Sequence, residues 1–328
     1  MRAAAQSGRP RIGLALGAGG ARGWAHIGVL RRLDELGVPI DCVAGTSAGA
    51  LVGAAYLAGR IELLEGLSRR LDRHQMARLF FEVNFPRAGL LTGRPVERFL
   101  QEVIGVDRIE ALDRPFAAVA TDLLAHHERV FTQGGLIDAI RASISIPGVF
   151  TPARCGDRDL VDGALVNPLP VSVLRAMGAA RIIAVDVNLR PGTGSETAPA
   201  PADAEPARTT SDLPKATDDL IQRFYQRLPQ LSRRSAKMEA LVQKWTHRRS
   251  GLTIFDVLTQ STRIFENQLT RSRLLTDPPD LLIQPAVGDI ATLDFSRTAP
   301  AIAAGAQAVD EKLPAVRALL DALKPPGP

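Results

Sequence analysis

Short apolar runs that are typical of buried strands alternate with longer helix-like runs between residues 10 and 190, and this alternation constrains the fold strongly. The strands that this pattern predicts are Ile12–Leu16, Ile40–Ala44, Phe116–Ala120, a short run at Leu160-Val161, and Arg181–Val187. Helices are predicted between them, for example over Pro95–Ile104 and Leu136–Ile144. Strands that are apolar throughout need helices on both faces of their sheet. The alternation therefore predicts a three-layer α/β/α fold with a mainly parallel central sheet.

The chain changes character after residue 190. Residues 191–217 are rich in Pro, Ala, Thr and Ser and keep no apolar period, which is typical of a linker or a surface excursion. Residues 218–325 are mostly helical in pattern, with a strand-like Leu281–Ile283 and an Ala-rich helix expected over Pro300–Leu323. We therefore expect a core over residues 10–190 and a C-terminal part, 218–325, that returns to complete the same domain.

The positive charge of the chain is concentrated in one segment. The net charge is +5, whereas residues 223–249 alone contain eight Lys and Arg residues against a single Glu239. An amphipathic basic segment of this kind is typical of a helix that contacts an anionic membrane surface. It is equally typical of a solvated basic face over a packed apolar stripe. No recognisable nucleic-acid-binding motif accompanies it, so we expect no nucleic-acid partner.

Composition also limits the compartment. The two cysteines, Cys42 and Cys155, lie far apart, which indicates neither a disulfide framework nor a metal cluster. No apolar run approaches the roughly 18 residues of a membrane span, and the polar N-terminus does not resemble a secretory signal. The sequence therefore predicts a cytoplasmic protein. Peripheral contact with the inner face of the membrane, through residues 223–249, stays open, as does the oligomeric state.

A glycine-rich loop, Gly17-Ala18-Gly19-Gly20-Ala21-Arg22-Gly23, follows the first predicted strand and opens the first predicted helix. Backbone N–H groups in such a loop bind anions or stabilise a developing oxyanion. A dinucleotide fingerprint would need glycine at the position of Arg22 and an acidic partner about 20 residues later, for which Asp41 is the available candidate. The oxyanion interpretation uses Gly17, Gly19 and Gly20 as they stand, with Arg22 adding positive charge. The loop is also compatible with a simple turn.

A second glycine-flanked turn places a hydroxyl group between a strand and a helix. Gly45-Thr46-Ser47-Ala48-Gly49 matches the pattern G-x-S-x-G, in which small residues let the turn tighten and expose the serine. Ser47 is therefore a candidate nucleophile, with Gly45 and Gly49 shaping its turn. The alternative is a turn serine that caps the following helix.

A nucleophilic serine needs a base, and the histidines are poorly placed to supply one. The histidine that follows the candidate acid in sequence, His247, lies in the basic segment, so a complete Ser, Asp and His triad is not favoured. The remaining candidate base is Asp162, which ends a short apolar run and precedes Gly163 and Ala164. A carboxylate with an ordinary pKa of about 4 is a weak base at neutral pH. Burial would have to raise the pKa of Asp162.

These segments, in their order and spacing, resemble the patatin-like phospholipases, particularly the compact bacterial cytoplasmic type. The resemblance rests on the two glycine motifs and Asp162-Gly163-Ala164, and also on the block Ala142–Pro152 and on Asn167-Pro168. It extends over about residues 11–190, with looser matches around Asp294-Phe295 and Gly305. It implies a catalytic core in which Ser47 is the nucleophile, Asp162 is the general base, and the Gly17 to Gly20 amides form the oxyanion hole.

We therefore expect a serine acyl hydrolase that cleaves phospholipid or lysophospholipid esters without a metal or a cofactor. Its expected partner is the lipid ester substrate itself. Two alternatives remain at this level. One is a nucleotide-binding oxidoreductase that uses the Gly17–Gly23 loop, and the other is a non-catalytic scaffold that is recruited to membranes.

Overall fold

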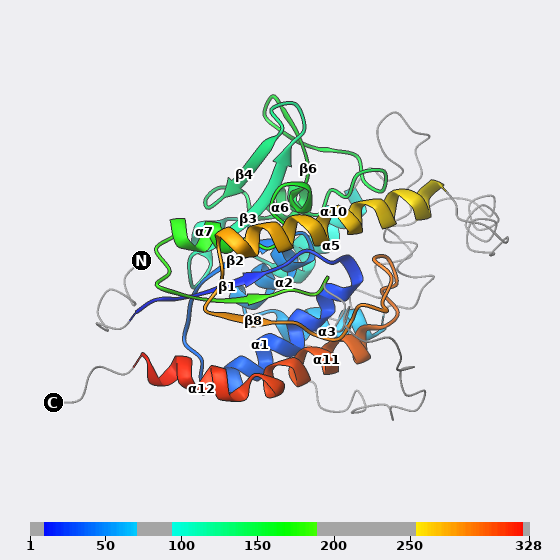
Figure 1. Cartoon of the computed structure of the whole chain (residues 1–328). Helices are drawn as coiled ribbons and strands as arrows, with labels where there is room; N and C mark the ends of the chain where they lie inside the picture. Colours follow the sequence, from blue (N-terminus) through cyan, green and yellow to red (C-terminus); the bar gives the residue numbers. More distant parts are fainter. Residues whose placement is uncertain (1–9, 71–93, 189–253, 324–328) are drawn as a thin grey trace.

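The computed structural model describes residues 10–70, 94–188 and 254–323. These residues form one central sheet and the helices around it (Figure 1). Within them the sheet has eight strands in the order β5-β6-β3-β2-β1-β7-β8, with β4 pairing β3 at the side. The strands are β1 Ile12–Leu16, β2 Ile40–Thr46, β3 Phe116–Asp122, β4 His127–Phe131, β5 Ala153–Cys155, β6 Arg158–Asp162, β7 Arg181–Val185 and β8 Leu281–Ile283.

The sheet is parallel over the five strands β3-β2-β1-β7-β8 and antiparallel where β4, β5 and β6 join it. Every side chain of β1 and β2 is buried, as the apolar pattern predicted. The sequence did not predict β4 and β5. Strand β4 has no fully buried side chain, and β5 has only one among its three residues, so neither shows an apolar run. Pairing with β3 and β6, rather than burial, defines these two strands.

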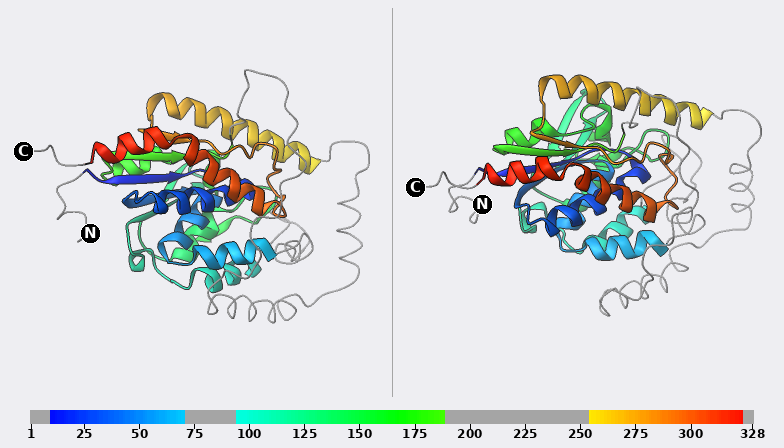
Figure 2. Two further views of the ribbon diagram at one scale, coloured as in Figure 1. Left: turned by 90° about the horizontal axis from the view of Figure 1, so that it is seen from below. Right: turned by 60° about the horizontal axis from the view of Figure 1, so that its bottom comes forward.

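Helices cover both faces of the sheet, and two apolar clusters mark the layers (Figures 1 and 2). The larger cluster joins the sheet to α1 and α2, and the smaller one joins it to α7 and the end of α10. The α-helices are α1 Ala25–Glu35, α2 Ala48–Leu57, α3 Ile61–Arg70, α5 Arg94–Ile104, α6 Leu136–Ser143, α7 Val171–Ala176, α10 Ile254–Thr276, α11 Thr298–Glu311 and α12 Leu313–Asp321. This arrangement confirms the predicted three-layer α/β/α fold.

The closing helix differs from the prediction of one helix over Pro300–Leu323. The chain forms two helices, α11 and α12, which are separated at Lys312. Pro314 lies in the first turn of α12, where its missing N–H does no harm. In the middle of one continuous helix the same proline would remove a hydrogen bond and clash with the carbonyl of Asp310. The proline therefore divides the helix.

The C-terminal elements return to the core at two places. Strand β8 pairs with β7 in parallel, and α11 packs closely on α1. The close approach depends on two glycines: a Cβ on Gly28 would lie 1.9 Å from the Ile302 carbonyl oxygen, and one on Gly305 would lie 2.0 Å from that of Ala25. We infer that residues 254–323 complete the same domain as residues 10–188. The predicted linker 191–217 and the helical patterns over 218–249 lie outside the described residues.

Helix α10 was not singled out by the sequence, although it is 23 residues long. It lies along the outside of the molecule, and its yellow N-terminal end extends beyond the sheet (Figure 1). Among the described helices, α10 included, none combines the length and the apolar character that crossing a membrane requires.

Candidate active site

Ser47 lies on a strained turn between β2 and α2. Its backbone φ of 55° and ψ of −121° is unusual for a residue with a side chain. The flanking glycines are needed for this turn: a Cβ on Gly45 would lie 2.5 Å from the Ala50 backbone, and one on Gly49 would lie 2.1 Å from the Leu16 carbonyl oxygen. Ser47 occupies the N-cap position of α2, but its side chain makes no capping hydrogen bond. The hydroxyl group therefore does not serve the helix.

The Ser47 hydroxyl is directed at Asp162 instead. Ser47 Oγ donates to Asp162 Oδ2 at 2.6 Å, and both residues are only 4% exposed. Asp162 ends β6, and its Oδ1 accepts the N–H of Ala164 at 2.9 Å. Gly163 permits this geometry, because a Cβ there would lie 2.2 Å from the Val119 carbonyl oxygen. The fold thus joins two residues that lie 115 positions apart in sequence.

Burial changes the acidity of Asp162. Removal from water raises the pKa of its carboxyl group to about 7, although the hydrogen bonds from Ser47 and Ala164 oppose this shift. Among the residues that the structure describes, no arginine or lysine contributes to this shift. The carboxyl group of Asp162 therefore changes its protonation state near neutral pH, whereas an ordinary aspartate is already ionised there.

A serine that the sequence left unassigned fixes the backbone of the turn. Ser143, the last residue of α6, accepts the Ser47 N–H at 2.8 Å and donates its own hydroxyl to the Val119 carbonyl at 2.6 Å. Ser143 belongs to the block Ala142–Pro152 that contributed to the resemblance, but a serine at a helix end gives no local signal of this role.

The described histidines do not line the cavity beside Ser47. His26 is buried beneath the glycine loop, where its Nε2 contacts the Gly17 carbonyl oxygen at 2.8 Å. Burial lowers the pKa of His26 to about 4, so it is neutral at physiological pH. His126 and His127 are exposed. His247, the histidine of a possible triad, lies outside the described residues.

The residues of the glycine loop fall into two groups: some amides are hydrogen-bonded within the protein, and other residues face the cavity. The Gly17 N–H donates to the Val185 carbonyl at 3.0 Å, and the Arg22 N–H donates to the Gly19 carbonyl at 3.2 Å. Gly19 and Gly20, by contrast, line the cavity together with Ser47. Gly20 has a φ of +57°, and a Cβ there would lie 2.3 Å from the Thr292 carbonyl oxygen. Of the four predicted oxyanion residues, the structure therefore brings Gly19 and Gly20 to the cavity.

Arg22 supports the loop from behind. Its side chain is fully buried, and its guanidinium donates to Asn188 Oδ1 at 2.7 and 3.2 Å, to the Ile290 carbonyl at 3.0 Å and to Thr292 Oγ1 at 3.3 Å. Burial lowers the pKa of Arg22 to about 10, so the group stays charged at neutral pH. The hydrogen bonds to these oxygen atoms stabilise the buried positive charge of Arg22.

Asn188 connects the loop to helix α10. Its Nδ2 donates to the Ala18 carbonyl at 2.9 Å and to Glu266 Oε2 at 3.2 Å. Burial, followed by the nearby charge of Asp162, raises the pKa of Glu266 to about 7. Asn188 and Glu266 are not predicted from the sequence, because a single polar residue after a strand or on a helix has no distinctive pattern.

We expect Asn188→Ala to lower kcat by up to about 100-fold, because displacement of a catalytic group by about 1 Å can have an effect of this size. The change removes an acceptor from the Arg22 guanidinium and a donor from the Ala18 carbonyl. Steady-state kinetics should show a fall in kcat with little change in KM. Asn267→Ala on α10 is the matched control. A loss of thermal stability with an unchanged kcat would contradict this positioning role.

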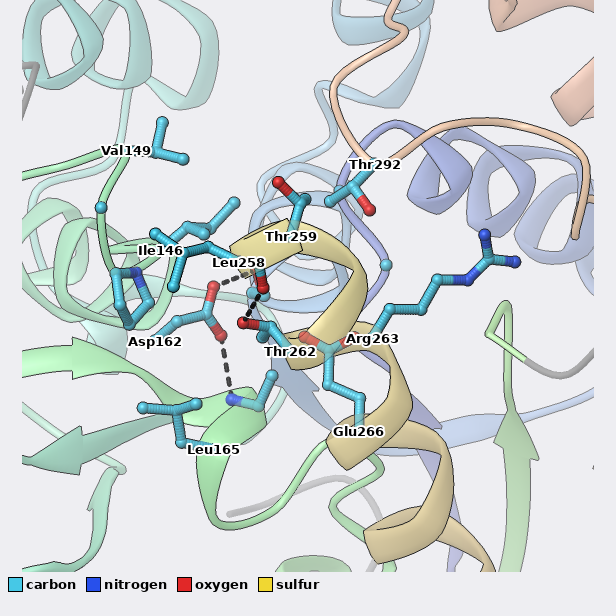
Figure 3. A pocket seen from close by; sticks show the side chains of 16 residues that line it. Ile146, Val149, Asp162, Leu165, Leu258, Thr259, Thr262, Arg263, Glu266 and Thr292 are labelled. Atoms are coloured by element: carbon cyan, nitrogen blue, oxygen red, sulfur yellow. Dashed lines mark hydrogen bonds between the residues drawn. The ribbon is translucent and has the colours of Figure 1, made fainter. Parts of the chain in front are cut away.

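The cavity beside Ser47 has an apolar side and a polar side. Figure 3 shows Ile146 and Val149 above Asp162 and Leu165 below it, whereas Thr292, Arg263 and Glu266 lie farther to the right. The Arg263 guanidinium donates to the Gly288 carbonyl at 2.7 Å. Apolar side chains around the Ser47 hydroxyl suit a ligand with a hydrocarbon chain.

The geometry does not suit a dinucleotide. Asp41, the candidate ribose ligand, lies at the amino end of the parallel strands, where its Oδ2 accepts the Ile12 N–H at 2.7 Å. The glycine loop follows Leu16 at the opposite, carboxyl end of β1. Among the described residues, no group of three or more His, Cys, Asp and Glu side chains could hold a metal ion.

The fold and the serine turn define a class of α/β proteins in which a glycine-flanked serine joins a central strand to a buried helix. Comparison with known proteins narrows the class. Residues 14–175 match the family model described as patatin-like phospholipase. An uncharacterized NTE family protein of Mycobacterium tuberculosis is 34% identical over 91% of this chain and 90% of its own length. The chain therefore belongs to the patatin-like phospholipase family, whose members are lipid hydrolases.

Other similar proteins are matched over a smaller share of their own length. The neuropathy target esterase sws of Drosophila melanogaster is 37% identical over 56% of this chain but only 13% of its own length. The crystal structure of VipD from Legionella pneumophila aligns over 94% of this chain and 67% of VipD, with a TM-score of 0.46 and 13% identity. This structural similarity is too distant to support an argument about function.

Proposed function

We propose that this protein is a serine acyl hydrolase that cleaves the ester bonds of phospholipids or lysophospholipids through a dyad of Ser47 and Asp162. The observation that carries this proposal is the buried 2.6 Å hydrogen bond from Ser47 Oγ to Asp162 Oδ2. A serine hydroxyl is a poor nucleophile until a base accepts its proton. Asp162 has both the position and, through burial, the basicity to accept it.

In the proposed reaction Asp162 takes the Ser47 proton as Oγ attacks the ester carbonyl carbon. The carbonyl oxygen becomes an oxyanion, and Asp162 then returns the proton to the departing alcohol or lysolipid. Water then attacks the acyl-serine carbonyl carbon while Asp162 takes its proton, and Asp162 delivers this proton to Ser47 Oγ as the fatty acid leaves. Esters suit this base better than amides, because an alcohol leaves more easily than an amine.

The oxyanion would be stabilised by the Gly19 and Gly20 amides. Both residues line the cavity with Ser47, whereas the Gly17 and Arg22 amides are already hydrogen-bonded within the protein. The positive ends of the dipoles of the short helix Gly20–Trp24 and of α2 add to this stabilisation. Loss of one oxyanion donor typically lowers the rate by about 100 to 1000-fold, so the loop matters nearly as much as the dyad.

A fluorophosphonate probe tests the proposal directly. We expect the probe to label the full-length protein covalently, with peptide mass spectrometry locating the adduct on Ser47. Incubation with phospholipid and lysophospholipid vesicles should release fatty acid. NAD binding without labelling would favour the oxidoreductase alternative, and absence of both signals would favour a scaffold.

The place of action is a further part of the proposal. The family implies a lipid substrate, and we propose a cytoplasmic enzyme that is peripheral to the inner face of the membrane. The basic segment 223–249 lies outside the described residues, so its contact with anionic lipid is supported by the sequence pattern alone.

A further inference from the structure

Helix α10 has its polar side turned inward and large apolar side chains turned outward. Thr262, Arg263 and Glu266 line the cavity beside Ser47, and Thr270 is only 1% exposed. On the opposite side lie exposed apolar residues: Val257 at 48%, Leu258 at 52%, Ile264 at 62% and Phe265 at 73%. A surface helix of a water-exposed protein normally has the reverse arrangement.

The exposed residues form one continuous face. Residues at positions 257, 258, 261, 264, 265 and 268 lie on the same side of a helix with 3.6 residues per turn. The two polar members, Ser261 and Gln268, are uncharged, and the first exposed charge that follows is Arg271. Both views of Figure 2 show α10 at the surface, with the described elements on its inner side. We call Val257, Leu258, Ser261, Ile264, Phe265 and Gln268 the outer face of α10.

The outer face continues into the candidate active site. Leu258 lines the cavity and is also 52% exposed, and Leu165 lines the cavity at 39% exposure. Leu165 follows directly after the Asp162-Gly163-Ala164 segment. Exposed apolar side chains therefore extend from the outer side of α10 to the cavity that contains Ser47, and none of the outer-face residues between them is charged.

We propose that the outer face of α10, together with Leu165, docks on the surface of a lipid bilayer and delivers the acyl chain of a bilayer lipid to Ser47. The proposal rests on the proposed lipid ester hydrolase function. A bilayer fits this face because the face is apolar, uncharged and continuous with the cavity that receives the lipid. An amphipathic helix lying in the interface plane buries its apolar side at the boundary of headgroups and acyl chains.

Because the outer face carries no charge, this docking should not need anionic lipid. It differs in this respect from docking through the basic segment 223–249, which would weaken as salt screens its charges. Binding to zwitterionic phosphatidylcholine vesicles at about 0.5 M salt, where the screening length falls to about 4 Å, therefore isolates the apolar contribution.

The test compares full-length wild type with the double variant Ile264→Glu and Phe265→Glu in vesicle flotation under these conditions. We expect the double variant to bind at least about tenfold less, which is equivalent to about 1.4 kcal/mol. Leu275→Glu is a distance control. Leu275 is 86% exposed and lies on the same side of the helix, but about 25 Å along it from Leu258 and beyond the exposed Arg271. Docking through the outer face near the cavity should leave Leu275 out of the bilayer, so binding by Leu275→Glu should match wild type.

Two activity assays separate docking from chemistry. We expect the double variant to lose hydrolysis of vesicle phospholipid in proportion to binding, while hydrolysis of water-soluble p-nitrophenyl butyrate stays unchanged. If wild type hydrolyses neither substrate, the proposed function fails, but vesicle flotation still tests docking by itself.

Several results would overturn the docking proposal. Equal vesicle binding by wild type and the double variant would do so, and so would an equal loss in Leu275→Glu. A large fall in the melting temperature of the double variant would show that the chain itself covers the face. A change from dimer to monomer in the double variant would show that a second copy covers it.

Discussion

Ser47→Ala should lower kcat for ester hydrolysis by at least about 10⁴-fold, since removal of the nucleophile from a serine hydrolase abolishes the covalent route and leaves only residual catalysis. Alanine lacks the Oγ that donates to Asp162 at 2.6 Å. It should preserve the turn, because the Ser47 N–H that donates to Ser143 Oγ is retained. The rates are best measured with p-nitrophenyl butyrate and with a lysophospholipid.

The control for this prediction is Ser296→Ala, which changes an exposed serine outside the cavity. We expect it to keep the wild-type rate and full labelling by a fluorophosphonate. Ser47→Ala should show no labelling while keeping a cooperative unfolding transition. More than about 1% residual activity, well above the level expected after loss of a nucleophile, would place the nucleophile elsewhere.

The strands that the sequence predicted are those whose burial is nearly complete. The strands β1, β2 and β3 are buried throughout, so each reads as an apolar run. Strand β4 alternates exposed and half-buried side chains, so pairing with β3 alone distinguishes it from a loop. Helix α10 posed the opposite problem: an apolar stripe normally indicates the inner side of a helix, whereas here the stripe faces outward.

The site could be predicted only as far as local motifs extend. The turns around Ser47 and Asp162 have glycines with a clear steric reason, and these glycines are visible in the sequence. The distance between the two side chains is set by the pairing of β3 with both β2 and β6, which no local pattern encodes. Asn188 is likewise brought to the glycine loop by the neighbouring strands β7 and β1.

Asp162→Asn should lower kcat by about 10³ to 10⁴-fold, the upper part of the range for loss of a general base. Asparagine is the sharpest probe because it has nearly the same shape. Its Oδ1 can still accept the Ala164 N–H, and its Nδ2 can donate to Ser47 Oγ, but it cannot take the serine proton. Steady-state assays with p-nitrophenyl butyrate measure this fall in kcat.

The pH dependence identifies the base. Wild-type kcat/KM should rise with pH and reach half its maximum near pH 7, because Asp162 acts only when ionised and its pKa is about 7. Glu266 shares the cavity and also has a pKa of about 7, so the two carboxyl groups titrate as a pair. Glu266→Gln should keep the rise with pH, whereas Asp162→Asn should lose it. The opposite result would make Glu266 the base.

Stability separates loss of chemistry from loss of fold. The pKa of Asp162 is higher in the folded chain than the ordinary value of 3.8, so the folded state binds its proton more tightly than the unfolded state. This contribution stabilises the fold fully below about pH 4 and is lost as pH rises toward 7. At pH 8 wild type has already lost this contribution, so its removal in Asp162→Asn has no cost there. The variant should therefore be at least as stable as wild type at pH 8 in chemical denaturation, although it is nearly inactive. A variant that is both inactive and unfolded at pH 8 would contradict the idea that the basicity of Asp162 is maintained at the expense of stability.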